Sequence, residues 1–285
     1  MTILQKNFKN PLDKNSIMYY FIYSTKYHYK EGGAEMNDYI YESEEEMNFL
    51  KSYDASKYKR PSVTADIVIF TLGDAGNLQV LLIKRGGFPY KGRWAIPGGF
   101  VNVGKESVDE AAARELKEET GVENVYLKQL YTFGEPGRDP RTTVISVAYT
   151  ALVPKGELKV QAGDDAQEAC LFNIRYDVNG IIFYNDELSF TEDRLAFDHR
   201  DIIRMAITRI RNRIDYEDDA FSLLKNKHRF TISELKVIYE AIKNEKLDLP
   251  NFRKAFLRDY VAKGKVHESG ETSIGKGKPA KLYSI

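Results

Sequence analysis

The sequence predicts an α/β domain built on a mixed β-sheet, followed by a small helical domain that ends in a β-hairpin. Three observations support this prediction. β-Branched segments recur between residues 63 and 184 and enclose one strongly charged helical segment. After residue 197 helical periodicity replaces the strand pattern, and the last twenty or so residues alternate around a run rich in Gly and Lys.

Length and composition fit this architecture. A chain of 285 residues is long enough for two domains, and 42% hydrophobic with 29% charged residues is typical of a globular protein. The single cysteine, Cys170, excludes an internal disulfide and a cysteine-based zinc site, and it suits a reducing, cytoplasmic environment. The one apolar run near the N-terminus, residues 17–23, is too short to span a bilayer, so we expect no membrane partner.

We expect four parts along the chain. Residues 1–35 form an extension that is disordered or not native, because Lys30 to Gly33 is what a ribosome-binding site would encode in frame and Met36 follows at a suitable distance. Residues 36–197 form the α/β domain, residues 198–224 a linker helix, and residues 225–285 the terminal domain.

The expected elements of the α/β domain follow from local patterns. A short acidic helix is predicted over residues 43–53, with Ser43 and Glu46 as a capping box. β-Branched and aromatic runs predict strands over residues 63–72, 78–84, 125–133, 144–153, 171–174 and 181–184. Strands around one central helix make a mixed sheet covered by helices.

The central helix lies within residues 97–122. Ser107 and Glu110 form a capping box, so the helix should begin near Val108, and Gly121 is the expected C-terminal stop. Such a helix has roughly four turns.

Three carboxylates lie together on this helix. Glu115, Glu118 and Glu119 are three and four residues apart, where like charges repel each other unless a cation lies between them. Carboxylate oxygens are preferred ligands of Mg²⁺, which is normally shared between a few carboxylates and substrate phosphates. The alternative interpretation is a solvated run of charges.

This segment resembles the Nudix box, a glycine, five residues, a glutamate, seven residues and then R-E-aliphatic-X-E-E-X-G-aliphatic. The second part matches from Glu106 through Arg114 to Val122 at every fixed position. The first part departs from the pattern, because six residues instead of five separate Gly99 from Glu106. The resemblance implies a Nudix fold and an Mg²⁺ or Mn²⁺ ion held by Gly99, Glu115, Glu118 and Glu119. It also implies that Arg114 and these three glutamates are catalytic.

Two further stretches resemble the ADP-ribose pyrophosphatase branch and the NrtR-like regulators of the same superfamily. One is residues 89–101, which include Arg93. The other is the Gly- and Pro-containing loop of residues 133–141, where Arg138 and Arg141 are suited to bidentate contacts with phosphates. The resemblance implies an ADP-ribose-like nucleotide as the ligand and Arg93, Arg138 and Arg141 as its binding residues. The loop is otherwise an ordinary polar turn.

The general base is expected in residues 163–169. Nudix enzymes often take a further metal ligand or a base from this region, and Glu168 is the first choice, with Asp165 the second. A solvated acidic loop is the alternative.

The terminal domain carries a basic excess. Residues 225–285 contain 14 Lys and Arg against 7 Asp and Glu, a net charge of +7 in a chain whose total is zero. Isoleucines at helical spacing predict a helix over residues 198–214, which is a linker or a dimer face. Two more helices are predicted over residues 233–243 and 251–263, separated by Pro250, and two strands over 265–268 and 280–284.

Helix, turn, helix and hairpin make a winged-helix plan, in which the second helix enters the major groove and the hairpin contacts the backbone. The expected DNA contacts are Arg253, Lys254, Arg258, Lys276 and Lys278, and the alternative is a solvated basic face. A Nudix domain followed by a winged helix resembles the NrtR-like regulators over nearly all of residues 36–285. The resemblance implies a homodimer on a double-stranded DNA operator, and either retained hydrolysis or a catalytically silent sensor.

Overall fold

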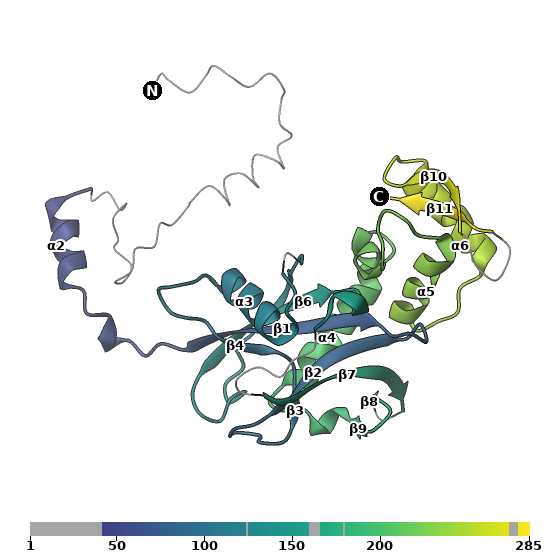
Figure 1. Cartoon of the computed structure of the whole chain (residues 1–285). Coiled ribbons are helices and arrows are strands. Elements are labelled where there is room, and N and C mark those ends of the chain that lie inside the picture. The colour runs from purple at the N-terminus through teal and green to yellow at the C-terminus, as the bar shows by residue number, and fades with distance from the viewer. Residues whose placement is uncertain (1–41, 124, 160–165, 179, 274–278) are drawn as a thin grey trace, which may run out of the picture. The chain divides into compact units, whose positions relative to one another are not determined.

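The computed structural model describes residues 42–123, 125–159, 166–178, 180–273 and 279–285 (Figure 1). Its residues fall into two compact units. Among the described residues, the first unit holds helix α2 (Glu44–Ser52), and the second spans Ser56–Asn102 and Glu106–Ile285. Ser43 caps α2 by accepting from the backbone N–H of Glu46, which confirms the predicted capping residue.

A nine-stranded mixed sheet forms the body of the second unit (Figure 1). Its order is β5-β6-β1-β2-β7-β8-β9, with β3 paired to β2 and β4 paired to β1. The pairing of β1 with β6 is parallel and the others are antiparallel. The strands are β1 (Ser62–Leu72), β2 (Leu78–Arg85), β3 (Trp94–Ala95), β4 (Gly98–Phe100), β5 (Lys128–Phe133), β6 (Val144–Leu152), β7 (Ala166–Asp177), β8 (Gly180–Tyr184) and β9 (Ser189–Thr191).

Helices cover both faces of this sheet, because β1 is apolar on both sides. Ala65, Ile67 and Ile69 pack with α3 (Val108–Thr120), while Val68 and Phe70 belong to the core that contains α4 (His199–Arg213). Short 3-10 turns lie at Ala55–Lys57, Lys155–Glu157, Glu192–Arg194 and Asp218–Leu223. The predicted mixed sheet between helices is confirmed.

The terminal domain has the predicted winged-helix order. It contains α5 (Ile232–Lys243), α6 (Leu249–Phe256), a π-helical turn (Leu257–Val261) and the hairpin of β10 (His267–Thr272) and β11 (Lys281–Ser284). Pro250 does not separate the helices as expected, because it lies in the first turn of α6. Backbone N–H groups in the first turn have no acceptor within the helix, so proline is tolerated there.

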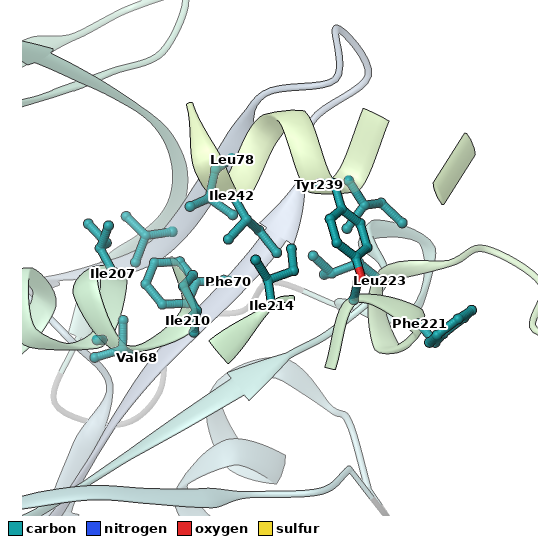
Figure 2. Close-up of a cluster of buried hydrophobic side chains, with 14 of the residues drawn as sticks. Val68, Phe70, Leu78, Ile207, Ile210, Ile214, Phe221, Leu223, Tyr239 and Ile242 are labelled. Carbon is teal, nitrogen blue, oxygen red and sulfur yellow. The ribbon is translucent and has the colours of Figure 1, made fainter. Parts of the chain in front are cut away.

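Helix α4 is not a free dimer face. Its predicted apolar stripe lies in the core, with Ile203, Ile207, Ile210 and Ile214 at most 5% exposed. In Figure 2 this stripe meets residues of β1, β2, α5 and the turn before α5, so one continuous core joins the sheet to the winged helix. None of the described helices has the length and apolar character needed to cross a membrane.

Candidate functional site

The carboxylate helix α3 begins and ends at the residues predicted from its caps. Ser107 and Glu110 form the reciprocal capping box, and Gly121 ends the helix in the left-handed conformation with φ of 65°. The buried face carries Ala111, Ala112 and Leu116 into the core beneath the sheet. This packing fixes which side of α3 presents its glutamates.

Arg114 connects the acidic residues of the site. Its guanidinium donates to both carboxylate oxygens of Glu106, at 3.0 and 2.8 Å, and Nη1 donates to Glu115 at 2.7 Å and to Glu118 at 3.2 Å. Nη2 also donates to the carbonyl of Phe100 in β4 at 3.2 Å. The hydrogen bond from Arg114 is the main reason that the pKa of Glu106 lies below its ordinary value.

The additional residue between Gly99 and Glu106 does not disturb this register. Gly99 stays in β4 opposite Ala65, and Glu106 still forms the bidentate pair with Arg114. Glu106 also accepts from the backbone and side-chain amides of Asn102, both at 2.9 Å. The turn after Asn102 therefore absorbs the insertion.

The α3 glutamates differ in burial. Glu115 and Glu119 are 8% and 7% exposed, whereas the side chain of Glu118 is 54% exposed. Burial raises the pKa of Glu115 above its ordinary value, against the lowering effect of Arg114, and the charges of Glu118 and Asp66 add to the rise. Gly99 lies so close that a side chain there would collide with the Glu115 carboxylate.

The carboxylates of Glu115, Glu118 and Glu119 on α3 form an acidic ridge. A cavity of about 120 Å³ adjoins this carboxylate ridge through Gly98 and Gly99. Its polar lining includes Asp66, Arg138 and His199, and its other lining residues are Thr64, Ile83, Arg85, Ile96, Phe100, Asp139, Arg141, Val144 and Phe197. Arginines and aromatic rings in one hollow are suited to phosphate groups and planar rings. Both predicted loop arginines line it.

The two loop arginines are held differently. Arg138, with a side chain only 5% exposed, forms a bidentate pair with Asp198 at 2.8 and 2.7 Å, and its Nη2 lies 3.9 Å from Asp66. Arg141 pairs with Asp139 at 3.0 and 2.7 Å but keeps 45% of its side chain exposed, over the ring of Phe100. Arg141 is therefore the more accessible of the two.

His199 is a buried neutral group of the cavity. Its Nδ1 accepts from the backbone N–H of Ile96 at 3.1 Å, and burial lowers its pKa below the ordinary value. Neutral imidazole is consistent with the role of an acceptor at Nδ1.

The winged helix presents part of the predicted basic surface. Arg253 and Lys254 lie exposed on α6, and within the described residues neither forms an ion pair. Arg258 instead pairs with Asp259 at the next position and, with Lys263, lowers the pKa of that carboxylate to about 2. Lys276 and Lys278 lie outside the described residues.

The comparisons with known proteins agree with this geometry. The NUDIX domain family matches residues 60–176, and the NrtR DNA-binding winged helix domain family matches residues 220–285. An ADPR responsive transcriptional repressor, NtrR, of Acinetobacter baylyi is 34% identical over 241 residues, covering 84% of this chain and 87% of that protein. The chain is an NrtR-type Nudix protein.

Two other relatives match this NrtR-type protein. The ADP-ribose pyrophosphatase of Methanocaldococcus jannaschii is 42% identical over 158 residues, covering 54% of this chain and 80% of that protein. The crystal structure of Shewanella oneidensis NrtR complexed with a 27mer DNA is 29% identical with a TM-score of 0.61, covering 78% of this chain and 93% of that chain. The predicted family and fold are confirmed.

Nudix hydrolases generally use divalent metal ions, and the α3 residues of this NrtR-type protein fit one. The guanidinium of Arg114 serves as a stand-in cation, since Nη1 alone reaches oxygens of both Glu115 and Glu118. Among the described residues no three His, Cys, Asp or Glu side chains are grouped as a preformed metal cage. Because Nη1 binds one oxygen of each carboxylate, a metal ion would bind the other oxygens of Glu115 and Glu118.

Glu168, the predicted base, lies on the other face of the sheet. In β7, Ala169 and Leu171 pack with the core between the sheet and α3, whereas Cys170 and Phe172 belong to the core on the opposite face. Side chains alternate between the two faces along a strand, so Glu168 lies on the same face as Cys170 and Phe172. Its carboxylate lies 3.4 Å from Lys84 and accepts from the Cys170 thiol at 3.3 Å. Asp165, the second choice, lies outside the described residues.

Arg93 does not line the cavity either. Its Nη1 donates to the carbonyls of Asp193 and Leu195, at 2.8 and 3.4 Å. Conversely, Asp66, Asp198, His199 and Phe197 were missed from the sequence. Asp66 lies in a strand and the others lie at the start of a helix, without a motif, so only a prediction that α4 packs against β1 would have revealed them.

Proposed function

We propose that this NrtR-type Nudix protein is a DNA-binding regulator whose Nudix domain binds an ADP-ribose-like nucleotide and hydrolyses it. The observation that carries the proposal is the adjacency of the arginine-lined cavity to the α3 carboxylates through Gly98 and Gly99. A nucleoside in the cavity would extend its diphosphate toward α3. The relatives named for ADP-ribose support the choice of ligand.

The residues have distinct parts in this function. Arg141 and Arg138 would bind the phosphates, and Phe197 and Phe100 would pack against the planar base or the ribose. Arg114, anchored on Glu106, holds Glu115 and Glu118 on one side of α3. Glu115, Glu118 and Glu119 would hold Mg²⁺ or Mn²⁺, which neutralises a diphosphate and lowers the pKa of a water molecule.

Hydrolysis is tested by incubating the full chain with ADP-ribose and Mg²⁺ and measuring the release of AMP. We expect release that depends on Mg²⁺ and that falls by about 100-fold or more in Glu118→Gln. If the wild type shows no turnover but still binds ADP-ribose in calorimetry, hydrolysis is contradicted and the assignment of the ligand stands.

Sensing without hydrolysis is the second candidate function. The relative that matches 84% of this chain is named as an ADPR responsive transcriptional repressor, which favours it. The affinity for ADP-ribose, measured with and without Mg²⁺, separates the two functions. A silent sensor binds ADP-ribose equally well in both conditions.

DNA binding by the winged helix is tested on the duplex upstream of the protein's own gene. We expect binding as a homodimer with an affinity that falls steeply with salt, because basic side chains displace counterions from phosphates. Binding that does not respond to salt, or a monomer at the concentrations that bind DNA, would contradict this part.

A further inference from the structure

Asp198 occupies the N-cap position of α4 but does not cap the helix. Its side chain makes no capping hydrogen bond, and its backbone, with φ of −96° and ψ of 18°, lies outside the extended region that N-cap residues normally adopt. Both carboxylate oxygens are instead bound by Arg138. The preceding residue, Phe197, is held in the left-handed region with φ of 50°.

Arg138 is at the same time a wall of the cavity. Its neighbours there are the buried carboxylate of Asp66, at 3.9 Å, and the loop that carries Arg141. A phosphate offers a guanidinium the same bidentate geometry as a carboxylate and carries more charge. A phosphate that enters the cavity therefore competes with Asp198 for Arg138.

The other end of α4 is bonded to the winged helix. Arg211 donates from Nε to the carbonyl of Ile242, in the last turn of α5, at 2.8 Å. Ile210 and Ile214 of α4 belong to the same hydrophobic core as Ile242 and Tyr239 of α5 (Figure 2). Because the 15-residue helix is packed along its length, it provides a contiguous path of packed side chains from its first turn to α5.

We propose that Asp198 couples occupancy of the cavity to the winged helix. In the ligand-free state Asp198 is held by Arg138. When a ligand phosphate takes Arg138, the released carboxylate accepts from the backbone N–H of Arg200, the second residue of α4, and the helix with its α5 contacts takes a second position. The N–H groups of His199 and Asp201 already donate to the carbonyls of Ala196 and Asp198. This inference rests on the proposed function, since it requires both a phosphate ligand and DNA binding.

A purely structural ion pair is the alternative, and the same helix offers a matched control for it. Glu192, 7% exposed, binds Arg204 of α4 through both of its oxygens, but neither residue lines the cavity. Asp198→Asn and Glu192→Gln each remove one charge from a bidentate pair at α4. Only the first should affect coupling.

The experiment measures the DNA affinity of the full chain with and without saturating ADP-ribose, on the duplex upstream of its own gene. We expect ADP-ribose to change the dissociation constant by about fivefold or more in the wild type and in Glu192→Gln, but by less than about twofold in Asp198→Asn. Asp198→Asn should bind ADP-ribose at least as tightly as the wild type, because the ligand phosphate no longer competes with a charged carboxylate for Arg138. Arg211→Gln should also lose the coupling while it retains ADP-ribose binding.

The outcomes separate the inference from the proposed function. A wild type that binds no ADP-ribose or binds no DNA overturns both. A wild type that binds both, with no effect of one on the other, overturns the inference alone. A wild type that responds, together with an Asp198→Asn variant that responds equally, overturns the role of Asp198 alone. If Asp198→Asn lowers ADP-ribose affinity, the carboxylate is part of the ligand site and the inference fails as well.

Discussion

At the scale of single residues, this site is determined by how one arginine and three glutamates share charge. Arg114 donates to both oxygens of Glu106 and to one oxygen each of Glu115 and Glu118, so it offsets part of the negative charge of these glutamates. The ionised form of Glu115 is destabilised, because this residue is nearly buried and lies near the carboxylates of Glu118 and Asp66. The negative charge that a metal ion requires at Glu115 therefore lowers the stability of the metal-free fold.

Glu115→Gln should stabilise the metal-free protein at neutral pH. The pKa of Glu115 is raised by burial, so the folded state binds the proton more tightly than the unfolded state. The free energy of unfolding therefore falls as the pH rises from the ordinary glutamate pKa, about 4.3, to the raised value, so the burial penalty is larger at pH 7 than at pH 3.5.

Thermal unfolding at pH 7 and at pH 3.5 measures this effect. The variant should unfold at a higher temperature than the wild type at pH 7 and at the same temperature at pH 3.5, and added Mg²⁺ should stabilise only the wild type. A variant less stable than the wild type at pH 7 would show that the hydrogen bond with Arg114 outweighs burial.

Gly99→Ala should abolish hydrolysis with little loss of fold. The added methyl group would collide with the Glu115 carboxylate and displace it from the ridge, so Mg²⁺-dependent AMP release should fall by about 100-fold. Gly156→Ala is the control, since no heavy atom outside its chain neighbours lies within 4 Å of the new methyl group. Equal activity of the two variants would show that Glu115 does not bind the metal ion.

At the scale of elements, α6 differs from the helix expected from the sequence. It ends at Phe256 and continues as a π-helical turn, and the pairing of Arg258 with Asp259 takes place in that turn. On α6 itself, the unpaired basic side chains therefore lie before this turn. They are Arg253 and Lys254, in the last turn of α6.

Arg253→Ala combined with Lys254→Ala should weaken DNA binding more than Arg258→Ala. Each lost phosphate contact should reduce the slope of log affinity against log salt by about 0.9, so the double variant should lose nearly 2. Arg258→Ala should change the slope little, because its charge is already paired with Asp259. A titration series of salt concentrations on one duplex measures all three, and a larger loss in Arg258→Ala would contradict this order.

At the scale of the whole molecule, the sheet, α4 and the winged helix share one hydrophobic core. Lys128 of β5 adds a partly buried ion pair with Glu217 and Asp219, between α4 and α5. A chain joined in this way should unfold as a cooperative unit, which distinguishes it from two domains on a flexible linker.

Ile210→Ala should destabilise both domains together, by about 2–5 kcal/mol, because it opens a cavity in the shared core. The fluorescence of Trp94, the single tryptophan, reports on the Nudix core, and far-UV circular dichroism reports on all helices. The two denaturant curves should coincide and shift together. Val178→Ala, at a fully exposed position, is the control, and separated transitions would indicate independent domains.

Much of this protein could be predicted from local sequence. The caps of α3, the spacing of its glutamates, the isoleucine stripe of α4 and the winged-helix order depend on neighbours within a few turns, and all are confirmed. Strand bounds were less accurate, since β7 runs from Ala166 to Asp177 where a strand over 171–174 was expected. Its ends are set by pairing with β2 and β8, which local propensity does not contain.

The sequence by itself determined the family, the acidic ridge and the basic terminal domain, because each is written in residue types at short fixed spacings. Only the tertiary structure decided that Glu168 faces away from α3, that Arg138 is bound by Asp198, and that α4 lies inside a core. Arg138 and Asp198 are 60 residues apart in the chain. Their contact depends on sheet register and helix packing, which are properties of the whole fold and not of any segment.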